Sequence, residues 1–168
     1  LTLSKRNNMR AVLDVYASGH ECEEFWYSNV PDALAKSHQA LFAGSCTGGA
    51  YREVEVLVDG VSAGARYPFP TIYTGGVCPQ MWRPITGIYS FNVPPISFDL
   101  SPLLPWLNDG RPHEIAVRVV GNSINGTWYL DPVLRMWQDA SSSSALTGRV
   151  LVRRRTPPRI RADWRPAG

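Results

Sequence analysis

The stretch Tyr51-Arg52-Glu53-Val54-Glu55-Val56-Leu57-Val58-Asp59-Gly60 decides the fold class. Its valines at every second position alternate with two glutamates, which is the period of a β-strand that has one apolar face. The Asp-Gly pair directly after the strand favours a tight hairpin turn. We therefore expect residues 63–67 to return antiparallel to this strand.

Outward from this hairpin, several other short segments have the composition and alternation of strands. The predicted strands cover residues 10–17, 97–100, 114–120, 128–137 and 148–153, and residues 23–28 are expected to be extended. Residues 101–107 predict a single helical turn, and residues 31–42 have weak helical spacing. Fourteen Pro and fourteen Gly separate these segments, which favours short strands over long helices.

The pattern predicts an all-β fold, an antiparallel jelly-roll β-sandwich with a short helical turn and long aromatic loops. We expect this domain to span residues 1–156 and a basic, irregular tail to follow over residues 157–168. With 168 residues, of which 44% are hydrophobic and 18% charged, the chain has the composition of one globular domain.

Charge and hydropathy exclude two classes of partner. The formal net charge is +3, and most of the excess lies in the arginines that follow residue 152. Basic residues are not interleaved with aromatic residues in the domain itself, so we expect no nucleic-acid partner. The chain contains no run of about eighteen apolar residues, so we expect no membrane-spanning helix.

The three cysteines, Cys22, Cys46 and Cys78, have no CxxC partner and no histidine pair at zinc spacing. We therefore expect no metal site. An odd number indicates one disulfide and one cysteine that is either free or bonded to another chain. The sequence Asn125-Gly126-Thr127 is an acceptor for N-glycosylation, and it favours a secreted protein.

The segment Glu23-Glu24-Phe25-Trp26-Tyr27 is the first candidate for chemistry. In an extended segment the two glutamates point to opposite faces, one with Trp26 and the other with Phe25 and Tyr27. A carboxylate beside aromatic rings has a raised pKa that suits proton transfer, and the rings suit the C–H faces of sugars. The same pattern also fits a solvated edge over an apolar core.

A second candidate lies in the Pro- and Gly-rich loop over residues 68–85. Tyr73, Trp82 and Arg83 there could form a carbohydrate platform with an arginine fork for polar groups. The alternative is that Trp82 caps the sandwich and Arg83 stacks on it. Among the histidines, only His20 is close enough to Glu24 in sequence to be of interest.

Four segments in order, residues 23–29, 51–60, 68–76 and 82–85, resemble the A-type peptide:N-glycosidases of plants and fungi. The resemblance covers roughly residues 10–137 and little of the tail. It implies hydrolysis of the amide between N-acetylglucosamine and Asn in N-glycoproteins or glycopeptides, without cofactor or metal.

The resemblance extends to the architecture of the F-type bacterial glycoamidases, in which two eight-stranded jelly rolls share one active site. Their Cys-x-Glu-aromatic segment is matched by residues 22–25, which implies that Glu24 is the catalytic glutamate, with Glu23 beside it. Phe25, Trp26, Tyr73, Trp82 and Arg83 are the implied substrate-binding residues. Their Cys-Pro-x-Met is matched by residues 78–81, but the arginine that precedes it by four residues is Thr74 here, so its role is either unfilled or passes to another residue, for which Arg83 is the candidate.

The catalytic aspartate of that architecture belongs to the first jelly roll, which would lie N-terminal to Leu1. The resemblance therefore implies a companion jelly roll, on the same polypeptide or on a second subunit of a heterodimer, without which the domain is inactive. The bacterial partner of the cysteine next to the glutamate falls on Trp26 here. This substitution implies that Cys22 pairs with Cys46 and leaves Cys78 for another partner.

Two readings compete with the glycoamidase. A carbohydrate-binding β-sandwich without catalysis would use the same aromatic loop, and substitution of Glu24 would then change affinity only. A purely structural jelly roll would have extensive interfaces and no sugar affinity. Release of a glycan from an Asn-linked glycopeptide distinguishes the three.

Overall fold

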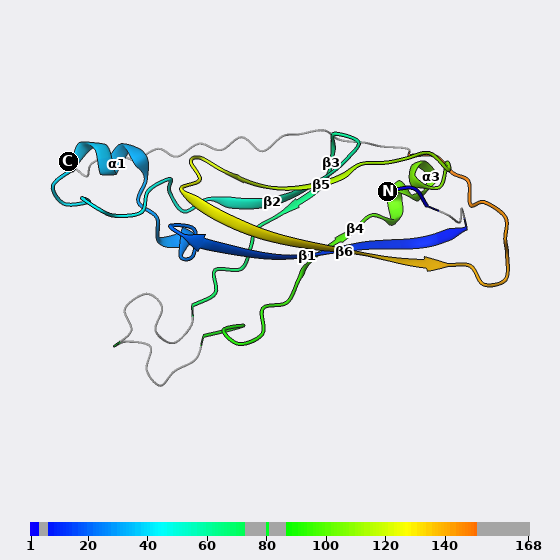
Figure 1. Ribbon diagram of the computed structural model, residues 1–168, viewed down its shortest axis with the longest axis horizontal. Coiled ribbons are helices and arrows are strands. Elements are labelled where there is room, and N and C mark those ends of the chain that lie inside the picture. The colour runs from blue at the N-terminus through cyan, green and yellow to red at the C-terminus, as the bar shows by residue number, and fades with distance from the viewer. Residues whose placement is uncertain (4–6, 73–79, 81–86, 151–168) are drawn as a thin grey trace.

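The computed structural model describes residues 1–3, 7–72, 80 and 87–150 and contains two antiparallel sheets stacked face to face (Figure 1). The first sheet has the strand order β4-β1-β6, and the second has the order β3-β2-β5. The strands are β1 (Asn8–Glu21), β2 (Arg52–Val58), β3 (Val61–Arg66), β4 (Ile96–Asp99), β5 (Ile115–Gly121) and β6 (Gly126–Gln138). The predicted all-β sandwich is therefore confirmed.

Helices are short and lie at the two ends of the sandwich (Figure 1). At one end the 3-10 helix η1 (Trp26–Ser28) and the helix α1 (Asp32–Ser37) follow β1. At the other end η2 (Ser101–Leu103) leads into α3 (Leu104–Leu107), and together they form the predicted helical turn. No helix among the described residues is long and apolar enough to cross a bilayer.

The hairpin that decides the fold forms as predicted. β2 and β3 pair antiparallel from Val54↔Arg66 to Val58↔Val61. Asp59 and Gly60 at the turn have φ values of 49° and 73°, and two consecutive positive φ values are typical of the turn that an Asp-Gly pair favours. β2 pairs on its other side with β5 over its whole length.

The core lies between the two sheets and is built from alternate residues of the strands. Leu13 and Val15 of β1 face Val54 and Val56 of β2, and all four are at most 2% exposed. Phe98 of β4 packs across to β3, where a Cβ atom on Gly64 would lie 3.2 Å from its ring. The predicted valine face of β2 is therefore buried and forms one side of the core.

Differences from the predicted elements are small except at two places. β1 and β6 are longer than expected, because they pair with each other from Asn8↔Gln138 to Glu21↔Gly126. Residues 23–28 are not extended, as described below. In the predicted strand over residues 148–153, residues 148–150 form no strand, and the remainder lies outside the described residues, as does the tail over residues 157–168.

Hydrogen bonds of His113 link the α3 end of the sandwich to the β2–β3 hairpin. Its Nδ1 lies 2.8 Å from Asp59 Oδ2, and its Nε2 lies 3.1 Å from Asp109 Oδ1. Its peptide N–H donates to the carbonyl of Leu1, whose amino group donates back to the His113 carbonyl. Burial lowers the pKa of His113, but the hydrogen bonds to the two aspartates outweigh burial and hold the pKa above its usual value.

This cluster predicts that stability decreases with rising pH. Because the folded-state pKa of His113 is raised, its contribution is complete below the unfolded value of about 6.5 and is lost as pH rises through the folded value. Urea denaturation at a series of pH values measures the free energy of unfolding. His113→Asn should remove this decrease, whereas the same change at the exposed His38 should leave it. An unchanged pH profile in His113→Asn would contradict the assignment.

Candidate active site

The segment that carries the predicted catalytic glutamates is a tight turn after β1. Glu21, the last residue of β1, has a φ of 59°, and the N–H groups of Glu23 and Glu24 donate to the carbonyls of His20 and Glu21. η1 follows directly. The expectation of an extended segment is therefore wrong. The tertiary hydrogen bonds of the Glu23 side chain, described next, outweigh the strand preference of the aromatic residues around it.

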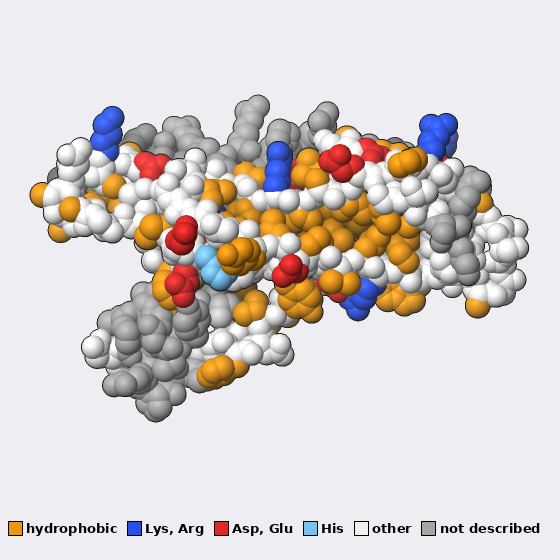
Figure 2. Space-filling model, viewed as in Figure 1, with side chains coloured by type: hydrophobic (Ala, Val, Ile, Leu, Met, Phe, Trp, Pro, Cys, Tyr) orange, Lys and Arg blue, Asp and Glu red, His pale blue; other side chains and the backbone are white. Residues whose placement is uncertain are grey.

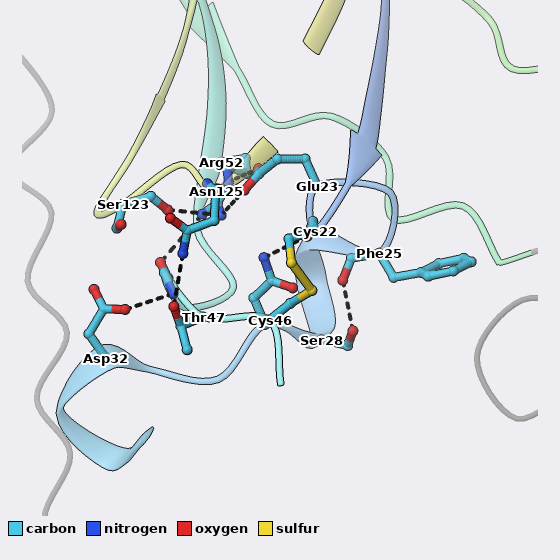
Figure 3. The surroundings of a disulfide bond; sticks show 12 residues. Cys22, Glu23, Phe25, Ser28, Asp32, Cys46, Thr47, Arg52, Ser123 and Asn125 are labelled. Carbon is cyan, nitrogen blue, oxygen red and sulfur yellow. Dashed lines mark hydrogen bonds and ion pairs between the residues drawn. A yellow bond between two sulfur atoms is a disulfide. The ribbon is translucent and has the colours of Figure 1, made fainter. Parts of the chain in front are cut away.

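Glu23 is a buried, fully engaged carboxylate. Its side chain is inaccessible to solvent, and it forms a two-point ion pair with Arg52, in which Nη2 lies 2.7 Å from Oε1 and Nε contacts Oε2. The backbone N–H of Asn125 donates to Oε1 at 3.0 Å, and the indole N–H of Trp128 donates to Oε2 at 2.9 Å. Figure 3 shows Glu23 directed towards Arg52 and Asn125.

These contacts determine the ionisation of Glu23. Burial raises the pKa of its carboxyl, but the hydrogen bonds from Arg52, Trp128 and Asn125 outweigh burial and hold the pKa below its usual value. The raised pKa expected for a carboxylate beside aromatic rings is therefore wrong for Glu23. It stays ionised with four donors around it, which suits a positioning role and not proton transfer with a substrate.

Arg52 connects three chain segments through its hydrogen bonds. Besides Glu23, its guanidinium donates to the carbonyls of Gly49 and Tyr51 at 3.1 and 2.6 Å, and to the carbonyl of Ser123 at 3.1 Å. The side chain is inaccessible to solvent. Arg52 therefore ties the start of β2 and the β5–β6 connection to the turn after β1.

Two glycines allow this turn to approach its neighbours. A Cβ atom on Gly19 would lie 2.2 Å from the Glu23 carbonyl oxygen, and one on Gly126 would lie 2.6 Å from the His20 carbonyl oxygen. Both distances are shorter than any real Cβ contact. Any side chain at these positions would displace the turn that carries Glu23 and Glu24.

Glu24 points to a different environment from Glu23. It is exposed and lines a cleft of about 280 Å³ together with aromatic side chains. The lining also includes His20, Trp26, Tyr27, Phe69 and Trp128. Trp26 and Tyr27 thus share one cleft with Glu24, although an extended segment would have placed them on opposite faces.

The cleft joins the turn after β1 to the loop that follows β3. Tyr27 donates its hydroxyl to the Thr71 carbonyl at 2.9 Å. Burial and the nearby charge of Glu24 both raise the pKa of Tyr27, so the hydroxyl stays protonated. The ring of His20, which also lines the cleft, packs edge-on against Tyr129 with 4.5 Å between the ring centroids.

The remaining predicted substrate-binding residues are Phe25, Tyr73, Trp82 and Arg83. Phe25 packs edge-on against Tyr27 at 6.3 Å, is absent from the described lining of the cleft, and points away from the disulfide in Figure 3. Tyr73, Trp82 and Arg83 lie outside the described residues, as does Cys78.

A disulfide between Cys22 and Cys46 closes the turn on its outer side, so the predicted pairing is confirmed. The Cα atoms are 5.2 Å apart, and the bond closes a loop that contains η1 and α1. The Asn29 side chain donates to the Cys22 carbonyl at 2.8 Å, and Val30 N–H donates to the Cys46 carbonyl at 2.9 Å. The loop is therefore held by backbone bonds as well as by the disulfide (Figure 3).

Within the described part of the chain, no three His, Cys, Asp or Glu side chains are grouped so that they could hold a metal ion. Among the described lining residues of the cleft, Glu24 is the one carboxylate, and it lies exposed among aromatic rings. Such a site can stack the C–H face of a sugar and accept hydrogen bonds from its hydroxyls, its amide or a water molecule.

Comparison with known proteins identifies a family. Residues 2–154 match the family model described as peptide N-acetyl-beta-D-glucosaminyl asparaginase amidase A. The chain belongs to this family. No solved structure matches the chain.

One curated member of the amidase A family is the almond (Prunus dulcis) peptide-N4-(N-acetyl-beta-glucosaminyl)asparagine amidase A. It is 42% identical over 138 residues, which make up 82% of this chain. The match covers 24% of the almond protein, so this chain spans about a quarter of the relative's length.

Sequence reasoning missed two residues that organise the site. The strand pattern accounts for the position of Arg52 but not for its charge, which needs a partner when a strand with an apolar face carries it into the interior. The strand pattern likewise accounts for Trp128 but not for its indole N–H, which usually finds an acceptor when the ring is partly buried.

The buried ion pair predicts a large loss of stability when one member is removed. Glu23→Ala leaves the Arg52 guanidinium buried without its carboxylate, which should lower the free energy of unfolding by about 3–5 kcal/mol. Urea denaturation measures the loss. Glu114→Ala, at an exposed glutamate, is the control and should change stability by less than about 0.5 kcal/mol.

A double variant tests whether the loss comes from the uncompensated charge. Glu23→Leu combined with Arg52→Met removes both charges and should recover part of the stability that Glu23→Ala loses. If Glu23→Ala has the stability of the control, the turn does not depend on this ion pair.

Proposed function

We propose that this chain is the second jelly-roll domain of a glycoamidase. The enzyme would hydrolyse the amide between N-acetylglucosamine and Asn in N-glycosylated peptides or proteins. The observation that carries the proposal is the position of Glu24, an exposed carboxylate in an aromatic cleft, on a turn fixed by the Glu23–Arg52 pair. Membership of the amidase A family and the name of the almond relative support the same reaction.

The proposed reaction breaks one C–N bond. Water adds to the side-chain carbonyl carbon, and the bond between that carbon and the amide nitrogen breaks. The nitrogen stays on the sugar and takes up a proton, so the products are aspartate and a glycosylamine. The partly exposed ring of Trp128 would stack on the N-acetylglucosamine, and Glu24 would hold the water or the sugar next to the amide. Trp26 is largely buried and would support the wall of the cleft. Binding that is stronger in the transition state than in the ground state accelerates such a step.

The described cleft supplies only part of what this reaction needs. Glu23 is occupied by four donors, which leaves Glu24 as the carboxylate of the predicted pair that can meet a substrate. We propose that a companion jelly roll supplies the general base, an aspartate, and that the domain is active only with it. The length of the almond relative supports further polypeptide in the complete enzyme.

Glu24→Gln in the complete polypeptide tests the assignment of Glu24. The amide keeps the size of the side chain but removes its charge, so deglycosylation of an Asn-linked glycopeptide should fall by at least about 100-fold while the fold is kept. Mass spectrometry of the released peptide measures turnover, and circular dichroism checks the fold. Glu21→Gln is the matched control, because Glu21 is exposed in the same turn and is absent from the described lining of the cleft.

The outcomes separate the competing functions. Near-wild-type turnover in Glu24→Gln would refute the assigned role of Glu24. A complete polypeptide that binds glycopeptide without turnover would be a carbohydrate-binding sandwich, and one without affinity would be a structural jelly roll.

We also propose that the protein is secreted. The disulfide between Cys22 and Cys46 suits an oxidising compartment, where such bonds persist. Asn125 is exposed at the start of β6, so the glycosylation sequence is accessible. Its side-chain nitrogen donates to Thr47 Oγ1 at 2.8 Å, which uses one of its two N–H bonds.

Expression in a eukaryotic secretory host tests the glycosylation of Asn125. The intact mass of the wild type should exceed the sequence mass by one N-glycan, and Thr127→Ala should remove the excess because the acceptor sequence is lost. Thr47→Ala is the control, since it removes only the hydrogen bond to Asn125. A wild-type mass equal to that of Thr127→Ala would show that the site is unused.

A further inference from the structure

Four strands lie at the edges of the two described sheets, and three of them carry features that discourage pairing with another strand. β4 is only four residues long. β3 has a register shift against β2 between Val56 and Leu57, which is a bulge or irregularity. β6 contains Pro132, which has no N–H to donate. Short strands, bulges and prolines are the usual protection of sheet edges.

β5 has none of these features. Its sequence, Ile-Ala-Val-Arg-Val-Val-Gly, contains no proline, and its register against β2 is continuous from Arg52↔Gly121 to Val58↔Ile115. Its one charged residue, Arg118, bonds Glu55 of the same sheet at 2.7 Å. An exposed edge of this composition is a predicted aggregation site unless another strand pairs with it, so its composition points to a partner strand.

The hydrogen-bond pattern shows which amides face the open edge. Asp59 N–H donates to the Glu114 carbonyl, so the pair next to Val58↔Ile115 is a hydrogen-bonded one. Bonded and non-bonded pairs alternate along an antiparallel ladder. The amides of Ile115, Val117 and Val119 therefore point away from β2, towards the open edge.

The side chains of the same three residues leave part of the core uncovered. They are only partly buried where they pack against the core, and so are Leu130, Leu134 and Met136 on the facing strand β6. Figure 2 shows the result as a band of hydrophobic side chains between β5 and β6, in the view of Figure 1. A strand paired with β5 would place every second side chain over this band.

The described sheets also fall short of a full jelly roll. They contain six strands, whereas a jelly roll has eight. Additional polypeptide is available in the family, because about three quarters of the almond relative lies outside the match.

We propose that an extended segment from the polypeptide outside residues 1–168 pairs with β5 and covers the band between β5 and β6. The segment alternates apolar and polar residues, with the apolar ones over Val117 and Val119. This inference extends the proposed need for a companion: the companion would complete this sandwich as well as the active site. It is tested by amide exchange and not by turnover, so failure of the amidase assay leaves it standing.

Hydrogen exchange in the complete polypeptide tests the proposal with an internal control. The amides of Ala116, Arg118 and Val120 bond β2 and are protected in any case. The outward amides of Val117 and Val119 should be protected to a similar degree, exchanging at least about 100-fold more slowly than open amides. Outward amides that exchange at the open rate while the inward ones are protected would overturn the proposal.

A pair of substitutions separates backbone pairing from packing. Val117→Pro removes an outward N–H, keeps the bonds to β2 and should abolish the protection of Val119. Val117→Ala, the matched control, trims the same side chain but keeps the N–H and should preserve that protection. Equal effects of the two variants would contradict strand pairing at β5.

A photo-reactive residue at Arg118, whose side chain is 59% exposed, identifies the segment. Mass spectrometry should locate the cross-link in a peptide from outside residues 1–168. A cross-link within residues 1–168, or to an isotope-labelled second copy, would overturn the proposed occupant.

Discussion

The ion pair between Glu23 and Arg52 is the interaction on which the candidate site depends. Both side chains are inaccessible to solvent, and a buried charge is tolerated only when its partner and its hydrogen bonds are complete. Here they are complete, since Arg52 donates to four further carbonyls and Glu23 accepts from Asn125 and Trp128. The end of β1, the start of β2 and the β5–β6 connection therefore share one anchor.

This anchor separates the roles of two adjacent glutamates. Glu23 directs its carboxylate inwards, where all of its hydrogen bonds are made within the protein. Glu24 lies at the surface of the aromatic cleft. The indole N–H of Trp128 donates a hydrogen bond to the Glu23 carboxylate. This bond orients the Trp128 ring, which lines the same cleft as Glu24. The position of the proposed catalytic group is thus set by a residue that need not touch the substrate.

Local pattern was sufficient for most of the fold. The alternation of Val54, Val56 and Val58 and the Asp59-Gly60 pair predicted the central hairpin because strand period and turn chemistry are local properties. The turn after β1 was not predictable in this way. Residues 23–28 contain no Gly or Pro and are rich in aromatics, so they read as a strand. Their turn depends on Arg52, which is far away in sequence, and on close approaches at Gly19 and Gly126. The pairing of Cys22 with Cys46 came from family resemblance, since three cysteines allow three different pairs.

The disulfide has a consequence for the integrity of the molecule. Cys22 and Cys46 enclose η1, α1 and the exposed Leu41 in one covalent ring. A protease that cuts one peptide bond between the two cysteines opens this ring but releases no fragment, because the sulfur bridge still joins both pieces. The strands on either side keep their partners, and Glu24 stays tethered to the scaffold. The loop between Cys22 and Cys46 can therefore be nicked by a protease without dismantling the domain.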